Sequence, residues 1–207
     1  MLELFILVFA SLVSVVNPLG AIPVYLALTP SYTSAERNGS ALMTSLYFVI
    51  ILLSFFFFGS YILSFFGITL SSLRIAGGLV IFNSGFGLLN GNFERNRVGK
   101  KVKDEARDKE DISFTPMAMP MLSGPGSISL LISLFAEYDS IEERGLIAGV
   151  IVFAGLVIFL ILKSAPLLFR ILGHSGIKAI SRIMGFLVMA IAVEYIVGGI
   201  ITLVSSY

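Results

Sequence analysis

Two short segments place proline, glycine and a small polar residue inside stretches that are otherwise almost entirely apolar. The first is residues 17–23, Asn-Pro-Leu-Gly-Ala-Ile-Pro, and the second is residues 123–126, Ser-Gly-Pro-Gly. Asn17 is a favourable N-cap and Pro18 a favourable first residue of a helix, and the second segment offers serine and proline for the same purpose. Each segment is therefore predicted to stop one helix and to start another.

A helix that starts inside a membrane has unpaired backbone N–H groups and a partial positive charge at its first turn. Two such ends that meet from opposite faces form a cradle for a carboxylate without using a charged side chain. Carbonyl groups before each break can receive an ammonium group or a cation, so a small zwitterion such as an amino acid fits both kinds of contact. The predicted substrate-binding residues are Asn17, Pro18, Leu19, Gly20, Ala21, Pro23, Ser123, Gly124, Pro125, Gly126 and Ser127.

The alternative interpretation is that proline and glycine only kink two transmembrane helices, as they often do. The placement of the segments favours a site, because they occupy corresponding positions in two similar halves of the sequence. Interrupted helices at corresponding positions of inverted repeats are typical of secondary transporters.

Six apolar stretches are long enough to cross a bilayer as helices. They cover residues 3–28, 40–63, 68–90, 113–136, 145–169 and 178–203. Of the 207 residues, 57% are hydrophobic and 13% are charged, which is typical of a polytopic membrane protein. The predicted fold is all-α, with six transmembrane helices of which the first and the fourth are broken at mid-membrane.

The two halves of the chain resemble each other at a nearly constant offset. Residues 73–80 align with residues 181–188, and the pair Glu36-Arg37 aligns with Glu143-Arg144. Each half would contain three spans, so the second half must enter the membrane from the opposite face. The predicted organisation is a first three-helix repeat at 1–90, a charged cytoplasmic loop at 91–112 and a second, inverted three-helix repeat at 113–207.

Charged residues predict the orientation of the chain. The loop at 91–112 holds seven Lys or Arg and six Asp or Glu, which indicates a solvated segment, with a regulatory or partner-binding role as the alternative. Most other basic residues lie on the same side, whereas Arg74 and Arg144 lie opposite. The positive-inside rule then places both termini of a multi-pass cell-membrane protein outside the cytoplasm. The basic residues form no single patch, so nucleic-acid binding is not expected.

Residues suited to enzymatic chemistry are scarce. The chain has no cysteine, and His174 is its single histidine. Disulfides and thiolate metal sites are excluded. Because His174 lies in a predicted cytoplasmic connection, neither a histidine metal cluster nor a Ser–His pair is expected. We therefore expect no enzymatic activity, no cofactor and no metal site.

Two polar residues inside the apolar stretches are candidates for ion coupling. Glu194 lies in the sixth stretch, and ionisable residues inside a membrane are often functional because burying them is costly. The alternative for Glu194 is pairing with a polar neighbour. Asn83, in the glycine-rich third stretch, is the second candidate, with hydrogen bonding between helices as its alternative role.

At residues 17–23 and 120–128 the chain resembles the MarC family of six-span integral membrane proteins, and the resemblance covers essentially the whole length. Archaeal members called SnatA transport glycine, alanine and similar neutral amino acids with cation coupling, so the resemblance implies a transporter of this kind. It places Asn17, Pro18, Gly20, Pro23, Ser123, Gly124, Pro125 and Gly126 at the site. Many members have Gln where this chain has Glu194, so proton coupling through that position is not implied.

The expected function is secondary active transport of small neutral amino acids by alternating access, coupled to H⁺ or Na⁺. The alternatives are a passive channel, a non-transporting membrane scaffold, and an exporter of other amino acids or drugs. The expected partners are the amino acid, the coupling ion and membrane lipid, with a homo-oligomer left open.

Overall fold

The computed structural model describes residues 1–29, 31–90 and 112–205. Helix is the only regular secondary structure in these residues, which confirms the predicted all-α class. The elements are α1 (Leu2–Val16), α2 (Pro18–Leu28), α3 (Ser34–Phe65), α4 (Leu70–Leu89), η1 (Ser113–Leu122), α7 (Pro125–Glu137), α8 (Ile141–Lys163) and α9 (Ala165–Ser205). The predicted loop at 91–112 lies almost entirely outside the described residues.

Within the described residues, five helical segments are long and apolar enough to cross a membrane. They are Leu2–Leu26, Ser34–Phe65, Leu70–Leu89, Ile141–Lys163 and Lys178–Ser205. The remaining predicted span, 113–136, is divided between η1 and α7, and each piece is too short to cross alone. The break at Ser123 and Gly124 is the reason for this difference from the six predicted spans.

Helix α3 begins earlier than its apolar stretch because of a capping box. The Thr33 hydroxyl accepts the Glu36 N–H at 3.3 Å, and the Glu36 carboxylate accepts the Thr33 N–H at 2.7 Å. This reciprocal pair satisfies two N–H groups that a helix start would otherwise leave free. The helix therefore starts at Ser34, six residues before the predicted span at 40–63.

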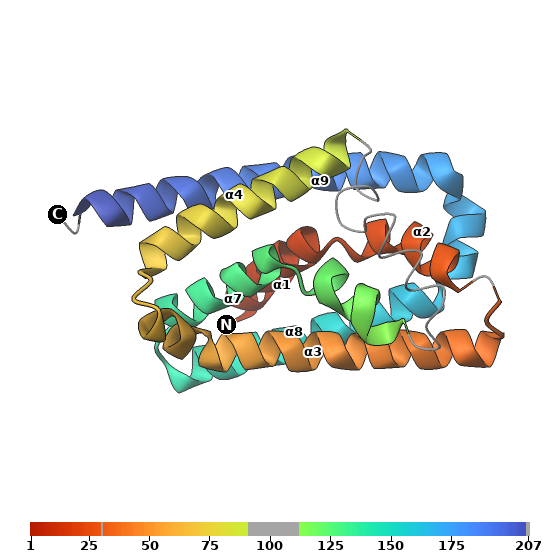
Figure 1. The fold of residues 1–207 in the computed structure, drawn as a ribbon, viewed down its shortest axis with the longest axis horizontal. Helices are drawn as coiled ribbons and strands as arrows, with labels where there is room; N and C mark the ends of the chain where they lie inside the picture. The colour runs from red at the N-terminus through yellow and green to blue at the C-terminus, as the bar shows by residue number, and fades with distance from the viewer. Residues whose placement is uncertain (30, 91–111, 206–207) are drawn as a thin grey trace.

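The helices alternate in direction along the long axis of the molecule (Figure 1). Elements α1 and α2, then α4 and α8, run one way, whereas α3, η1 with α7, and α9 run the other way. Helices α4 and α9 lie on one side, α3 and α8 lie on the opposite side, and α1, α2, η1 and α7 lie between them. The broken helices are thus the central layer of the bundle.

Glycine allows α4 and α9 to pack with their backbones in close approach. A Cβ atom on Gly85 would lie 2.8 Å from the carbonyl oxygen of Gly185, and a Cβ on Gly185 would lie 2.7 Å from that of Gly85. Any side chain at either position would push the helices apart. Small residues at such crossings are typical of helix packing in membranes, where van der Waals contact replaces hydrophobic burial.

Candidate ligand site at the two helix breaks

The first break consists of one residue, Asn17. It adopts a left-handed conformation, with φ 48° and ψ 64°, which asparagine tolerates better than most residues. Its backbone N–H donates to the Val13 carbonyl at 2.9 Å, and its side-chain Oδ1 accepts the Gly20 N–H at 3.3 Å. Asn17 therefore ends α1 and caps α2, which starts at Pro18 as predicted.

The second break is longer and has no side-chain cap. Ser123 and Gly124 separate η1 from α7, and Pro125 is the first helical residue of α7. Gly124, at the cap position, has no side chain that could accept from the first turn of α7. The Ser127 hydroxyl does not serve as a cap either, because it donates to the Gly124 carbonyl at 2.9 Å. The first N–H groups of α7 therefore have no side-chain partner at the cap.

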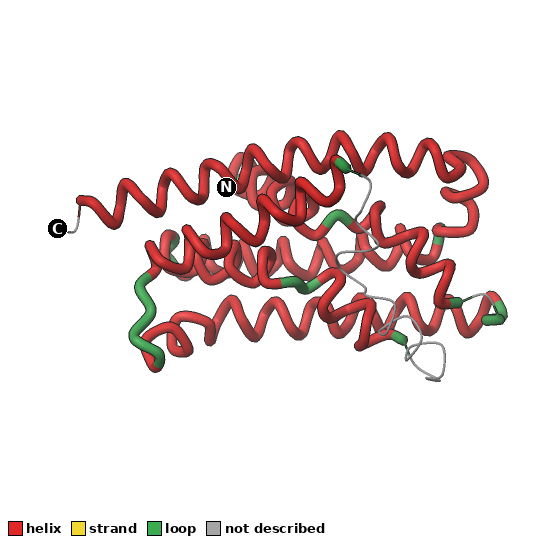
Figure 2. Tube along the Cα trace, turned by 45° about the horizontal axis from the view of Figure 1, so that its top comes forward, coloured by secondary structure: helices red, strands yellow, loops and turns green. Residues whose placement is uncertain are grey.

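The two breaks lie next to each other. Gly126, just after the second break, faces Val15, just before the first, because a Cβ on Gly126 would lie 3.3 Å from Val15 Cγ1. Both breaks fall midway along the bundle (Figures 1 and 2). From there α2 and α7 run in opposite directions, so the N-termini of both helices face the middle of the molecule (Figure 1).

Each break contributes a buried polar atom that has no hydrogen-bond partner among the described residues. Asn17 is 1% exposed and Ser123 is 0% exposed. The unpartnered atoms are Nδ2 of Asn17 and Oγ of Ser123. An unsatisfied buried polar group costs about 1–3 kcal/mol, so these two atoms favour a bound polar ligand. Both can donate to a carboxylate.

The other predicted site residues occupy the first turns of the two restarted helices. Gly20, Ala21, Gly126 and Ser127 are buried, and Leu19 is partly buried. Pro18 and Pro125 take the first helical positions, and Pro23 lies within α2. Gly126 has a second close neighbour, since its Cβ would lie 2.8 Å from Ile81 Cγ1 on α4. Gly126 therefore permits close helix packing beside the breaks.

Comparison with known proteins identifies the family. The sequence model for MarC family integral membrane proteins matches residues 2–204, a range that contains both breaks. The chain belongs to the MarC family. It is 38% identical to the UPF0056 membrane protein MJ1677 of Methanocaldococcus jannaschii, over 96% of this chain and 97% of that protein. No solved structure shows a significant match to the chain.

Bacterial relatives have similar names. The chain is 38% identical to the UPF0056 membrane protein YhcE of Escherichia coli, over 93% of this chain and 89% of the relative. It is 33% identical to the UPF0056 inner membrane protein MarC of Citrobacter koseri, over 95% of this chain and 93% of the relative. The chain is thus an integral membrane protein, and the family resemblance predicted from residues 17–23 and 120–128 is confirmed.

This MarC-family chain also contains a cavity at the end of the bundle where α1 and α4 begin and α7 ends. Its volume is about 360 Å³. It is lined by Leu7, Val8, Ser11, Arg74, Leu130, Leu134, Glu137, Tyr138, Ile191, Glu194, Tyr195 and Gly198. Burial raises the pKa of the Tyr138 phenol, and the nearby Glu137 and Glu143 carboxylates raise it further.

The two ion-coupling candidates lie on other helices than those that flank the breaks. Asn83 is exposed on α4, and Glu194 is exposed on α9, where it lines the cavity. Sequence reasoning did not single out the ion pair in the same cavity, between Arg74 on α4 and Glu137 on α7, with Nη2 and Oε2 2.7 Å apart. The signal available in the sequence was that both residues lie at ends of apolar stretches on the same predicted side of the membrane.

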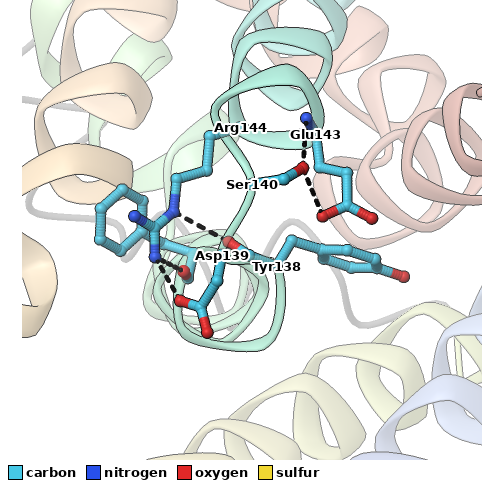
Figure 3. A network of polar contacts seen from close by, with 6 residues as sticks. Tyr138, Asp139, Ser140, Glu143 and Arg144 are labelled. Atoms are coloured by element: carbon cyan, nitrogen blue, oxygen red, sulfur yellow. Dashed lines mark hydrogen bonds and ion pairs between the residues drawn. The ribbon is translucent and has the colours of Figure 1, made fainter.

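Two arginines hold the far ends of the restarted helices in matching ways. Arg37 donates from Nη2 to the carbonyl of Thr29, the C-cap of α2, at 2.8 Å. Arg144 donates from Nε to the carbonyl of Tyr138, the C-cap of α7, at 2.8 Å (Figure 3). Each arginine lies in the first turn of the following helix and reaches back to the helix that ends before it. The guanidinium groups thus satisfy carbonyls that a helix end leaves free.

Proposed function

We propose that this MarC-family protein is a secondary active transporter of small neutral amino acids, such as glycine and alanine, and that it works by alternating access. One observation carries the proposal: two helix N-termini meet at adjacent breaks, where Asn17 Nδ2 and Ser123 Oγ are buried and have no hydrogen-bond partner among the residues that the structure describes. Binding sites at interrupted helices near the bilayer midplane are a recurrent feature of secondary transporters.

The chemistry of the breaks suits a carboxylate. The N–H groups in the first turn of α7, which has no side-chain cap, and the dipoles of α2 and α7 attract negative charge, and Asn17 and Ser123 add two donors. An ammonium group would rest on carbonyls at the ends of α1 and η1. The glycines at both breaks have no side chains, so the helix ends can enclose a small substrate closely. This favours glycine and alanine over larger substrates.

Alternating access requires two units that move relative to each other around the site. We assign these units to residues 1–90 and 113–207 as inverted three-helix repeats. The alternating helix directions and the matching arginines, Arg37 and Arg144, support this assignment (Figure 1). The starts of α3 and α8, which follow the two restarted helices, also support the assignment. The Thr33 hydroxyl accepts the Glu36 N–H at 3.3 Å, and the Ser140 hydroxyl accepts the Glu143 N–H at 3.1 Å.

In the proposed membrane arrangement, η1 and α7 together form one crossing, so that the chain spans the cell membrane six times. The breaks then lie near the midplane of the membrane. At that depth, non-helical backbone is tolerated only if it is buried in protein or lines a cavity. The excess of basic residues on one side supports an orientation in which both termini lie outside the cytoplasm.

The proposed coupling ion is H⁺ or Na⁺, with Glu194 as the candidate carboxylate. The charged and titratable groups that line the same cavity are Arg74, Glu137, Tyr138 and Tyr195. If Glu194 carries the proton, the Glu194→Gln variant will show uptake that varies much less with pH than uptake by the unchanged chain. An unchanged pH profile rejects this role for Glu194.

Transport is tested with the purified chain in lipid vesicles. Vesicles loaded with unlabelled glycine are expected to accumulate labelled glycine by saturable counterflow, which a carrier performs and a channel does not. Rapid flux without saturation would indicate a channel, and no flux with any substrate would indicate a scaffold. Competition by a panel of amino acids then separates a carrier for small neutral substrates from an exporter of others.

A further inference from the structure

The cavity at the end of the bundle is separate from the two breaks. Ser11, the lining residue of α1 that is nearest in sequence to the first break, precedes Asn17 by six residues, which corresponds to about 9 Å along a helix. Its walls come from both halves of the chain, from α1 and α4 in the first and from α7 and α9 in the second. A volume of about 360 Å³ is within the range of small-ligand sites.

The charges of the cavity do not cancel. Arg74 and Glu137 form an ion pair at 2.7 Å, so their charges compensate each other locally. Glu194 lines the same cavity and has no hydrogen bond or ion pair to any other residue in the described parts of the chain. One carboxylate therefore remains, and the cavity carries a net negative charge.

The apolar walls strengthen the effect of this carboxylate. Leu7 and Val8 on α1 and Leu130 and Leu134 on α7 form much of the lining. A cleft with one sign of charge and low-dielectric walls concentrates ions of the opposite sign. Anions are repelled from such a cleft, so it selects ligands by charge.

We propose that this cavity is a second binding site, which takes a small cation on the Glu194 carboxylate. The ligand class is a monovalent cation, supplied either by a primary ammonium group or by a metal ion such as Na⁺. The inference deepens the coupling-ion role of Glu194 and in this rests on the proposed function. Its test measures the potential and the cation binding of the cavity, so it can fail while transport of amino acids holds.

The absence of cysteine from the chain allows a direct test. Ser11→Cys introduces one thiol into the lining, and Ser64→Cys introduces one on the exposed end of α3 outside the cavity. Each variant, in lipid nanodiscs, is treated with cationic and anionic methanethiosulfonate reagents of similar size. The ratio of the two rates cancels differences in thiol reactivity and reports the local potential.

The cationic reagent is expected to be favoured at the Ser11→Cys thiol by roughly tenfold more than at the Ser64→Cys thiol. Adding Glu194→Gln should make the cationic-to-anionic rate ratio at the Ser11→Cys thiol similar to that at the Ser64→Cys thiol. Glu194→Asp keeps the charge and should preserve the difference between these ratios. Glu142→Gln removes an exposed carboxylate outside the cavity and should change nothing. A ratio that survives Glu194→Gln would overturn the proposal.

Protection experiments identify the source of the cation. Methylammonium and Na⁺ are each added at matched ionic strength, with choline as the bulky replacement. Slower modification of the Ser11→Cys thiol with methylammonium alone supports an ammonium site, and slower modification with Na⁺ supports a site for metal ions. If neither slows the reaction relative to choline, the cavity does not bind a small cation and the proposal fails.

Discussion

The two breaks achieve the same interruption by different means. At the first, Asn17 supplies the left-handed turn, the cap of α2 and a buried donor in a single residue. At the second, Ser123 and Gly124 interrupt the chain without a side-chain cap, after an element whose backbone leaves helical geometry at Thr115 and Met119. The shape of the first break is therefore fixed by local hydrogen bonds, whereas the shape of the second depends on the packing of neighbouring helices.

This difference suggests a division of roles. A break held by its own side chain keeps its shape when the surrounding helices move. A break without such a cap has free groups that a ligand can satisfy, and its geometry can change as packing changes. We therefore expect loss of the side-chain cap at the first break to affect mainly stability, and loss of the unpartnered hydroxyl at the second to affect mainly ligand binding.

The largest effect is expected where the two breaks touch. Gly126→Leu would insert a side chain where a Cβ alone already lies 2.8 Å from Ile81 and 3.3 Å from Val15. Overpacking costs 1–3 kcal/mol and occasionally more, so folded protein and uptake should both decline sharply. Gly145→Leu makes the same change where no atom lies within 4 Å, and should leave both unchanged. Size-exclusion chromatography in detergent and glycine counterflow measure the two effects.

Asn17→Ala should lower the free energy of unfolding by about 2 kcal/mol, because it removes the cap of α2 and strains the left-handed turn. Asn17→Asp keeps an oxygen for the Gly20 N–H but replaces the buried donor with an acceptor. It should keep most of the stability while glycine uptake falls at least tenfold. Thermal unfolding in detergent and uptake give the two values, and normal uptake by Asn17→Asp would remove Nδ2 from the site.

Ser123→Ala sharpens the contrast, because Ser123 Oγ makes no hydrogen bond within the described protein. Stability should stay the same or rise slightly, since an unsatisfied buried hydroxyl is removed. The affinity for glycine should fall by about tenfold, as expected for a lost hydrogen bond to a charged ligand. Half-saturation in counterflow measures this change. A loss of stability with unchanged affinity would show that the hydroxyl is structural.

The smallest effects are expected where the two halves match. The hydroxyls of Thr33 and Ser140 each accept the N–H of a glutamate three residues later, so Thr33→Ala and Ser140→Ala should each cost about 1 kcal/mol. Their midpoints of thermal unfolding should shift by similar amounts. A large difference between the two shifts would contradict the equivalence of these helix starts.

Much of the central layer could be predicted from local sequence. Asn-Pro and Gly-Pro restrict the backbone within two or three residues, so the ends of α1 and the starts of α2 and α7 could be located without tertiary information. The length and apolarity of the stretches predicted a membrane protein, because these too are local properties of the sequence. The six crossings stay a prediction, because the second break divides residues 113–136 into η1 and α7, each too short to count as a span by itself.

The relations between distant residues could not be read from these patterns. The ion pair of Arg74 with Glu137 and the cavity that also contains Glu194 join positions far apart in the chain. The neighbours of Gly126, on α1 and α4, come from different helices. Such contacts depend on how each helix is rotated and placed against the others, and helical periodicity alone does not specify that.

By itself the sequence determined that this protein is helical, that it belongs in a membrane and that its chain is interrupted at Asn17 and near Ser123, because these properties follow from apolarity and from backbone restrictions a few residues long. Only the tertiary structure decided that the interruptions lie side by side and that a cavity with an uncompensated carboxylate lies beyond them. The packing of side chains from separate helices sets those distances, and it is a property of the whole bundle.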